Sequence, residues 1–226
     1  MKIISWNCNG KFREKLKIIS ALDADIHIIQ ECENPAETKD KDYFLWANNY
    51  IWMGRNKNKG LGVFGKNSIN LEKLNWNEIC LKYFLPIKVN NQFQLLAVWT
   101  QNPYIEEYYI YHQLNKQNYD DDTIVFGDFN SNKNFDHKYT TRKERGHMST
   151  VNEFKLIGLE DAYHYVSKEE QGSESKNTFY LYRKKERGYH IDHCFVNPKN
   201  LISYSVLDDS YWLEFSDHMP CVLEIK

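Results

Sequence analysis

The sequence predicts an α/β fold, a four-layered sandwich in which two packed mixed β-sheets are flanked by helices. Three observations indicate it. The chain opens with a strand, a helix and a second strand; its middle holds consecutive short apolar runs; and its second half again mixes strands with helices. No linker, repeat or low-complexity tract interrupts the 226 residues, so we expect a single domain over residues 1–226.

The opening unit accounts for the first layer of this fold. Residues 2–6 form the first predicted strand, which ends at the turn-forming run 7–10 (Asn-Cys-Asn-Gly). Apolar residues then recur at helical spacing over 12–22, which predicts a helix with one face on a sheet. The apolar run 25–30 is predicted as a buried strand that delivers Glu31 at its end.

The middle of the chain has the pattern of consecutive strands. Four apolar runs are predicted as strands, at 50–53, 60–65, 84–89 and 93–99. Asn90 and Asn91 lie between the last two runs and are typical of a hairpin turn. A helix is expected over 106–117.

The second half repeats the mixture of strands and helices. A β-branched and aromatic run at 123–127 is predicted as a strand that ends at Asp128. Thr150 and Glu153 match a capping box and predict the start of a helix, which Gly158 ends. Further strands are predicted at 177–182, 190–196, 201–206 and 220–225.

The composition is that of an ordinary globular protein. Hydrophobic residues make up 42% and charged residues 27%, a balance that argues against disorder. Aromatic residues reach 15% and are expected mainly in the core, although some rings could stack on bases. The formal net charge of −2 excludes a protein that binds nucleic acid through bulk positive charge. Basic residues concentrate instead in two stretches, 138–145 and 183–187.

Cysteine usage and the N-terminal residues bear on the compartment. The five cysteines are scattered without any CxxC pair, which fits a reducing compartment and neither a disulfide framework nor a zinc ribbon. The first residues lack the long apolar run of a signal peptide, and no segment approaches membrane-spanning length. We therefore expect a cytoplasmic protein with no membrane segment.

Polar residues fall at the edges of the apolar strands. They are Asn7, Glu31, Asp128, Asn130, Asp217 and His218, with Asp192 inside a predicted strand. Side chains at strand ends can converge at one rim of a sheet although they are far apart in sequence. Carboxylate and amide oxygens suit a hard cation such as Mg²⁺, which can polarise a phosphoryl oxygen and stabilise a leaving alkoxide.

His218 and Asp192 form a candidate pair within this set. His218 is the natural general base for a water molecule, and a buried aspartate would orient its ring. Asp192 lies in an apolar strand, where an unpaired carboxylate would cost on the order of several kcal/mol. A histidine partner removes most of that cost.

Five segments carry a resemblance to a known family. They are 4–7 (Ile-Ser-Trp-Asn), 29–31 (Ile-Gln-Glu), 127–130 (Gly-Asp-Phe-Asn), 191–192 (Ile-Asp) and 216–218 (Ser-Asp-His). Each is a weak signal alone, but in this order and at predicted strand edges the chain resembles the endonuclease/exonuclease/phosphatase superfamily. That superfamily includes exonuclease III, apurinic endonucleases and DNase I. The resemblance spans the whole chain and implies a DNase I-like fold.

The resemblance implies a metal site that uses Mg²⁺ or Mn²⁺. Glu31 is similar to the principal metal ligand of the family. Asn7 is similar to a residue that helps to bind or position metal and phosphate, so it belongs to both the catalytic and the metal set. Asp217 is similar to a second acidic residue near the metal.

The remaining catalytic residues are also carried over from the resemblance. Asp128 is similar to the catalytic aspartate, which either aligns the attacking water or assists the leaving group. Asn130 resembles the amide that orients the phosphate. His218 resembles the histidine that contacts the scissile phosphate, with Asp192 as its partner.

The chain departs from the family pattern at two places. Trp99 or Thr100 stands where the family often has a tyrosine or histidine that contacts phosphate. Asn9 stands where apurinic endonucleases tend to have aspartate, which weakens assignment to that branch.

Four residues are candidates for substrate contacts. Trp99 occupies the altered position, and Phe179 follows a threonine in a way that is similar to the Thr-Trp pair of the family. Arg142 and Arg145 lie in the first basic stretch, where they could contact phosphates. The alternatives are a core position for Phe179 and a solvated face for the basic stretch.

Other histidines rank lower as functional residues. His190 and His193 flank Asp192 and could form a zinc pair, but no thiol or third ligand has suitable spacing. His147 is of interest because it lies between the basic stretch and a predicted helix start.

The sequence therefore predicts a metal-dependent phosphoester hydrolase that attacks phosphorus with water. DNA is the favoured substrate, because the chain is compact, its motifs resemble exonuclease III and basic stretches lie near them. The alternatives are a phosphatase or phosphodiesterase acting on a small molecule or lipid head group, and a catalytically silent binding module. We expect a monomer.

Overall fold

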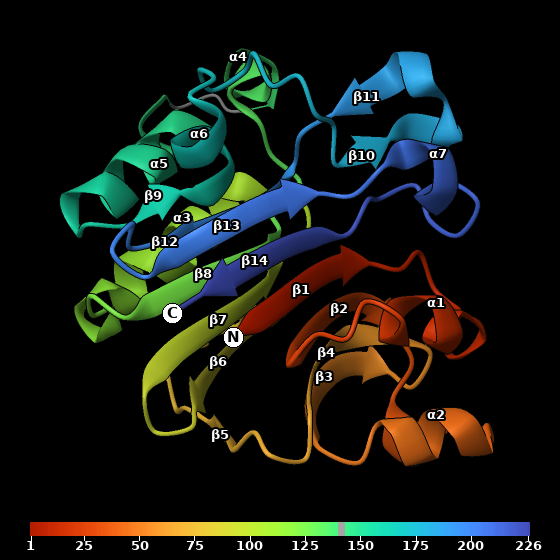
Figure 1. Cartoon of the computed structure of the whole chain (residues 1–226). Coiled ribbons are helices and arrows are strands. Elements are labelled where there is room, and N and C mark those ends of the chain that lie inside the picture. Colours follow the sequence, from red (N-terminus) through yellow and green to blue (C-terminus); the bar gives the residue numbers. More distant parts are fainter. Residues whose placement is uncertain (140–142) are drawn as a thin grey trace.

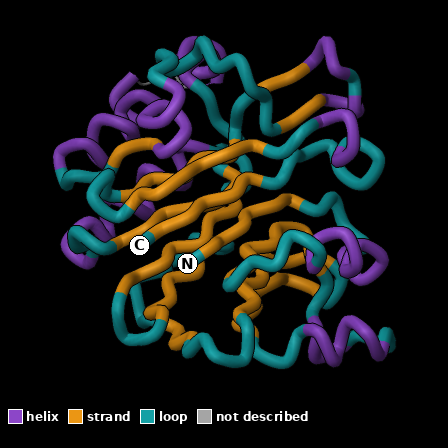
Figure 2. Tube along the Cα trace, in the orientation of Figure 1, coloured by secondary structure: helices purple, strands orange, loops and turns teal. Residues whose placement is uncertain are grey.

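Two six-stranded β-sheets pack against each other in the computed structural model, which describes residues 1–139 and 143–226. Strands gather in the middle of the molecule and helices lie at its periphery (Figures 1 and 2). The predicted α/β sandwich of two mixed sheets flanked by helices is confirmed.

The first sheet combines the N-terminal and C-terminal parts of the chain. Its order is β13-β14-β1-β2-β4-β3, with β1 parallel to β2 and the other neighbours antiparallel. The strands are β1 (Lys2–Asn7), β2 (Ile26–Cys32), β3 (Tyr50–Asn56), β4 (Lys59–Gly65), β13 (Leu201–Val206) and β14 (Cys221–Ile225).

The second sheet comes from the middle of the chain. Its order is β5-β6-β7-β8-β12-β9, and β7 and β8 are its parallel pair. The strands are β5 (Leu71–Lys73), β6 (Phe84–Val89), β7 (Phe93–Trp99), β8 (Thr123–Asp128), β9 (Glu160–Asp161) and β12 (Asp192–Val196). A small ribbon of β10 (Phe179–Tyr180) and β11 (Gly188–Tyr189) stands apart from both sheets.

Three hydrophobic clusters correspond to the interfaces between the layers. One lies between the sheets and joins residues such as Ile28 and Leu95, which alternate with outward-facing neighbours along their strands. A second lies under α1 (Leu16–Ser20), α2 (Lys41–Trp46) and α7 (Asp209–Trp212), on the outer face of the first sheet. A third lies under α3 (Ile105–Asn115) and α5 (His147–Leu156), on the outer face of the second. The remaining helices are α4 (Asp136–Tyr139) and α6 (Ala162–Ser167).

Local predictions succeeded where the pattern was purely periodic. Three predicted strands, β6, β7 and β13, have the predicted ends, and the turn at Asn90 and Asn91 has the positive φ angles of 49° and 61° that a primed hairpin turn requires. The helix over 12–22 is instead a 3₁₀ turn followed by the short α1.

Two local predictions were wrong. Thr150 does not cap α5, because the helix begins at His147 and the Thr150 hydroxyl donates back to the Gly146 carbonyl. The strand predicted at 177–182 shrinks to β10, because Tyr182 adopts φ 59° and turns the chain.

The two chain ends meet in the first sheet (Figure 1), where the N-terminal ammonium of Met1 donates to the Ile225 carbonyl at 2.7 Å. Across residues 1–139 and 143–226, no helix has the length and apolar character needed to cross a membrane.

Candidate active site

Both sheets contribute polar side chains to one shared rim. Asn7 ends β1 in the first sheet, and Asp128 ends β8 in the second. Asp192 begins β12, whose antiparallel register places it directly opposite Asp128. His218 lies in the segment that leads into β14, the antiparallel neighbour of β1. Strand direction and register therefore bring together residues that are up to 211 positions apart.

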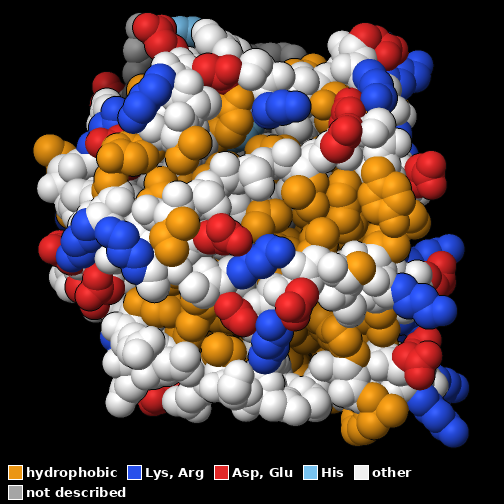
Figure 3. Space-filling model, viewed as in Figure 1, with side chains coloured by type: hydrophobic (Ala, Val, Ile, Leu, Met, Phe, Trp, Pro, Cys, Tyr) orange, Lys and Arg blue, Asp and Glu red, His pale blue; other side chains and the backbone are white. Residues whose placement is uncertain are grey.

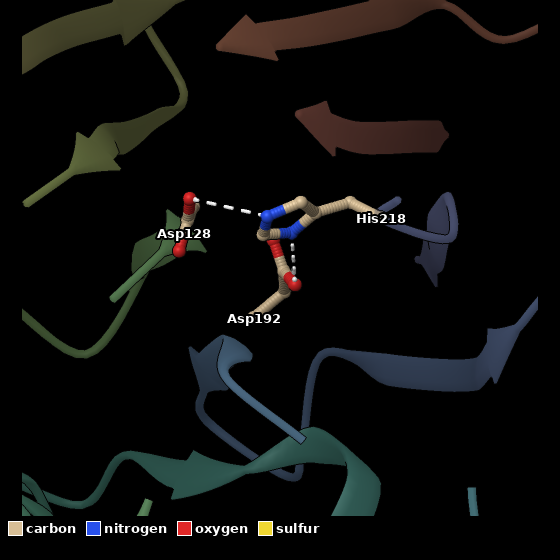
Figure 4. Close-up of side chains that lie close together, drawn as sticks. All are labelled: Asp128, Asp192 and His218. Atoms are coloured by element: carbon tan, nitrogen blue, oxygen red, sulfur yellow. Dashed lines mark hydrogen bonds and ion pairs between the residues drawn. The ribbon is translucent and has the colours of Figure 1, made fainter. Parts of the chain in front are cut away.

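The imidazole of His218 lies between two carboxylates (Figure 4). Its Nδ1 donates to Asp192 Oδ2 at 2.9 Å, and its Nε2 lies 3.9 Å from Asp128 Oδ2. All three residues are buried, with 5% or less of each exposed. The predicted partnership of Asp192 and His218 is thus present in the structure, and Asp192 starts its strand rather than lying inside it.

Backbone and hydroxyl contacts fix the position of His218. Its backbone N–H donates to Ser216 Oγ at 3.0 Å, and that hydroxyl donates to the Asn7 carbonyl at 2.7 Å. The indole of Trp6 donates to the His218 carbonyl at 2.9 Å. On the other side, the Thr178 hydroxyl accepts from the Asp192 backbone N–H at 3.0 Å. The orientation of the ring is therefore set by several elements.

Two asparagines hold the carboxylate of Asp128. Asn7 Nδ2 donates to one oxygen at 2.9 Å, and the backbone N–H of Asn130 donates to the other at 2.9 Å. Asn130 has φ 49°, a conformation that asparagine tolerates better than most residues. Its side-chain Nδ2 donates to the Thr100 carbonyl at 3.3 Å. The predicted grouping of Asn7, Asp128 and Asn130 is present.

The electrostatics of the site follow from burial and close charges. Burial raises the pKa of the Asp128 carboxyl to about 7, against the opposing effect of His218. Burial alone would lower the pKa of His218, but the carboxylates of Asp192 and Asp128 outweigh it and raise that pKa to about 10. His218 is therefore a cation at neutral pH, so Asp128 is better suited than His218 to accept a proton.

Glu31 lies at an irregular position of β2. It has φ 64°, and the pairing of β2 with β4 shifts register between Gln30 and Cys32, which is a β-bulge. The Glu31 carboxylate is 18% exposed and binds the Lys59 ammonium at 2.9 Å. Bulges reorient side chains, and this one turns Glu31 out of the regular strand pattern.

The residues predicted as metal ligands carry the oxygen donors that a hard divalent cation prefers, but within residues 1–139 and 143–226 neither Glu31 nor Asp217 belongs to a compact group of three ligating side chains. Glu31 and Asp217 offer carboxylates, and Asn7 offers an amide oxygen, the ligand type that Mg²⁺ prefers. The carboxylate of Glu31 already stabilises one positive charge, the Lys59 ammonium. Asp217 Oδ1 accepts from Asn9 Nδ2 at 2.9 Å, so the departure at Asn9 supports Asp217.

Asp128, Asp192 and His218 form a compact group of potential metal ligands within the described residues, with ligand atoms within 4.8 Å of one another. Both ring nitrogens of His218, however, face carboxylates. An imidazole in that setting is satisfied as a doubly protonated cation, and a protonated nitrogen cannot bind a metal. We therefore assign these three residues to proton and charge chemistry.

The predicted substrate contacts have separate locations. Phe179 borders the site, because its ring packs against His218 in a tilted arrangement with ring centroids 4.7 Å apart. Trp99 is 6% exposed, packs on Tyr83 and lies 5.7 Å below the Lys59 ammonium, so little of its ring can meet a substrate. Arg145 is half-buried in a 3₁₀ turn, and Arg142 lies outside the described residues.

The zinc pair is not supported. His193 Nδ1 contacts the Asp161 carboxylate at 2.8 Å, and His190 Nδ1 contacts the Lys176 carbonyl at 2.8 Å. Within residues 1–139 and 143–226, neither histidine belongs to a compact group of three ligating side chains.

Sequence reasoning missed three contributors. Lys59 lies at the start of β4, in a run of lysines and asparagines that reads as an ordinary polar turn. Ser216 is part of the Ser-Asp-His segment, and Thr178 directly precedes Phe179. Their hydroxyl groups, however, contact residues that are 209 and 14 positions away in the chain. Of these three residues, only Ser216 could have been found from the sequence, because it directly precedes Asp217 and His218.

Residues 4–218 match the family model described as Endonuclease/Exonuclease/phosphatase family. No curated protein matches the chain.

Solved structures share the fold along the whole chain. An AP endonuclease from Archaeoglobus fulgidus matches with TM-score 0.73 and 18% identity, covering 100% of this chain and 99% of that one. A Neisseria 3′ phosphatase, NExo, bound to a product DNA hairpin, matches with TM-score 0.72 and 18% identity over 100% and 99%. The Xenopus laevis APE2 catalytic domain matches with TM-score 0.71 and 17% identity over 100% and 92%. The predicted DNase I-like fold is confirmed.

Proposed function

The chain belongs to the Endonuclease/Exonuclease/phosphatase family and is a phosphoester hydrolase, and we propose that it is a Mg²⁺- or Mn²⁺-dependent nuclease whose substrate is DNA. The observation that carries the proposal is the buried Asp192–His218–Asp128 arrangement at the rim where the two sheets meet. The segments 4–7, 127–130, 191–192 and 216–218 supply residues of this rim, and segment 29–31 adjoins it through the pairing of Gln30 with Asn7.

The side chains have complementary roles in water attack on phosphorus. Asp128 takes the proton of the attacking water as the new O–P bond forms, and the P–O bond to the leaving oxygen breaks. His218, held as a cation by Asp192, offsets the negative charge that develops on the phosphoryl oxygens. Asn7 and Asn130 hold the Asp128 carboxylate in position.

A divalent cation at Glu31, with Asn7 and Asp217 beside it, would supply Lewis-acid stabilisation of the phosphoryl and leaving oxygens. This chemistry is compatible with few protein ligands, because Mg²⁺ usually keeps several of its own waters.

Two observations favour DNA among phosphoesters. Two similar folds belong to an AP endonuclease and to a 3′ phosphatase solved with a DNA hairpin. Phe179 borders the site as an aromatic surface for a base. Basic and acidic side chains are interspersed on the face in Figure 3, so a phosphate backbone would meet no uniformly basic surface there.

The test is hydrolysis of end-labelled duplex and single-stranded DNA with Mg²⁺, with Mn²⁺ and with a chelator. We expect metal-dependent cleavage that Asp128→Asn and His218→Ala reduce by about 10²-fold or more. The matched controls are Asp42→Asn and His137→Ala, which make the same changes at exposed positions and should retain activity.

Lack of cleavage by folded protein supplied with either metal would exclude the DNA nuclease. The similarity to a 3′ phosphatase makes release of inorganic phosphate from 3′-phosphorylated DNA the second candidate reaction. A model phosphodiester and a phosphomonoester tested alongside would identify activity on small molecules. Failure on every substrate, together with no metal binding, would leave the silent binding module.

A further inference from the structure

A second cluster of buried charges adjoins the active site on the opposite side of β12. His193 follows Asp192, and because successive side chains of a strand point to opposite faces, it points away from the catalytic group. His193 Nδ1 donates to Asp161 Oδ2 at 2.8 Å, and Nε2 donates to the Ser131 carbonyl at 3.0 Å. Both ring nitrogens of His193 therefore face oxygen acceptors, one from Asp161 and one from the loop that follows Asn130.

The contacts continue from Asp161 to a second loop residue. The other Asp161 oxygen contacts His164 Nδ1 at 3.1 Å, and His164 Nε2 contacts Glu174 Oε1 at 3.0 Å. Glu174 Oε2 accepts from Asn132 Nδ2 at 3.1 Å. The contacts thus run in a closed circuit between Ser131 and Asn132, which are adjacent in the chain.

This loop-anchoring network, comprising Ser131, Asn132, Asp161, His164, Glu174 and His193, is buried throughout. The side chains of its two histidines and two acidic residues are at most 10% exposed, and histidines alternate with carboxylates around the circuit. Burial alone would raise the pKa of Glu174, but His164 and backbone N–H donors outweigh it and lower that pKa to about 2. Buried charges paired in this way are costly to leave half-satisfied, so each link constrains the next.

We propose that the loop-anchoring network positions the loop that follows β8. It fixes the backbone N–H of Asn130, and this N–H in turn holds the carboxylate of Asp128. Ser131 and Asn132 directly follow Asn130, whose backbone N–H donates to Asp128 Oδ1. Anchoring both following residues fixes the peptide that presents this donor. The proposal rests on the proposed phosphoester chemistry only for its effect on rate; the positioning itself does not depend on the substrate.

The two oxygens of Glu174 accept from different partners, which gives sharp variants: Oε1 accepts from His164 Nε2 and the Gly172 backbone N–H, and Oε2 accepts from Asn132 Nδ2. In Glu174→Gln one oxygen replaces two, so the side chain can accept from His164 or Asn132 but not from both. Asn132→Ala cuts the same link without altering a buried charge, and serves if Glu174→Gln does not fold. The matched control is Glu170→Gln, the same change at an exposed position of the same segment.

The first readout is hydrogen exchange of the Asn130 amide, followed by NMR under conditions where all variants are fully folded. We expect exchange at least about tenfold faster in Glu174→Gln and in Asn132→Ala, and unchanged in Glu170→Gln. Wild-type exchange in both network variants would overturn the proposal, whether or not the protein cleaves DNA.

The second readout is a double-mutant cycle on the substrate that the wild-type protein turns over. We expect Glu174→Gln to lower kcat about tenfold with KM within about twofold, and to have little further effect in an Asp128→Ala background, where the Asn130 backbone N–H has no carboxylate to hold. Multiplicative effects would assign the network a merely structural role and overturn the proposal. If the wild-type protein turns over no substrate but the Asn130 backbone amide exchanges faster in the network variants, only the proposed function is overturned. The positioning of the loop would then still hold.

Discussion

At the scale of single residues, the protonation state of His218 sets the chemistry of the site. The ring is enclosed by the carboxylates of Asp192 and Asp128, and its pKa is raised to about 10. The sequence predicts that His218 is a general base. In the structure, the carboxylates of Asp192 and Asp128 raise its pKa and so favour the protonated ring. The proton acceptor that we propose is therefore Asp128, whose pKa burial raises to about 7.

The first residue-scale prediction concerns the pH dependence of stability in metal-free protein. The folded pKa of His218 lies above its ordinary value of 6.5, so its stabilisation is full below pH 6.5 and is lost as pH rises through about 10. The stabilisation should be worth about 1.5–3 kcal/mol, or roughly 3–12 °C in Tm. Thermal melts with a chelator should show His218→Gln less stable than wild type at pH 6, with the gap closing toward pH 10. A gap that widens with pH would contradict the ion-paired cation.

A second residue-scale prediction concerns Lys59, the lysine that pairs with the proposed metal ligand Glu31. Lys59 pairs with Glu31 and must yield that oxygen to a metal. An exposed pair of this kind is worth about 0.2–1 kcal/mol, so Lys59→Met should bind Mn²⁺ up to about fivefold more tightly in a calorimetric titration. Lys57→Met, on the same turn, is the control and should bind like wild type. Weaker or unchanged binding in Lys59→Met would argue against Glu31 as the ligand.

At the scale of elements, close approach of β7 and β8 places the catalytic aspartate. Gly127 precedes Asp128, and a Cβ at Gly127 would lie 2.0 Å from the Val98 carbonyl oxygen of β7. That atom belongs to the backbone of a paired strand and cannot move without breaking the ladder. Position 127 of the Gly-Asp-Phe-Asn motif therefore requires glycine for steric reasons, independently of any catalytic role.

Gly127→Ala should accordingly destabilise the protein and disturb Asp128. Overpacking of this kind costs about 1–3 kcal/mol, which urea denaturation measures directly. Gly65→Ala is the comparison, because its nearest neighbour is a side-chain amide 3.1 Å away. Equal losses of stability in the two variants would show that the approach of Val98 is not the cause.

At the scale of the whole molecule, the site exists only when both sheets are packed. Asn7 ends a strand of the first sheet and His218 lies in the segment that leads into β14 of that sheet, whereas Asp128 and Asp192 belong to the second sheet. The cluster between the sheets contains residues of both, so neither sheet keeps a complete core alone. The two sheets should therefore form one cooperative unit.

Unfolding should follow a single transition despite the two sheets. Thermal or urea unfolding followed by far-UV circular dichroism should coincide with unfolding followed by tryptophan fluorescence, since the six tryptophans are distributed along the chain. Two separated transitions would mean that the sheets unfold independently.

How far the sequence could predict this protein depended on the range of the interactions involved. Strand patterns such as 84–89 and 93–99 were read correctly because alternation and turn residues are local signals. The capping box at Thr150 failed because hydrogen bonds from elsewhere began the helix three residues earlier: Asp136 accepts from the N–H groups of His147 and Met148. No pattern around position 150 encodes that contact.

The sequence by itself determined the α/β class, the approximate strands and the polar residues that end them, because these depend on residues close together in the chain. Only the tertiary structure decided that His218 lies between Asp192 and Asp128. The same holds for the ion pair of Lys59 with Glu31 and for the buried contacts that anchor the loop after Asn130. These contacts join residues that are between 26 and 90 positions apart, and their distances are set by the packing and register of two sheets. A protonation state or an ion pair depends on such distances, which no local pattern contains.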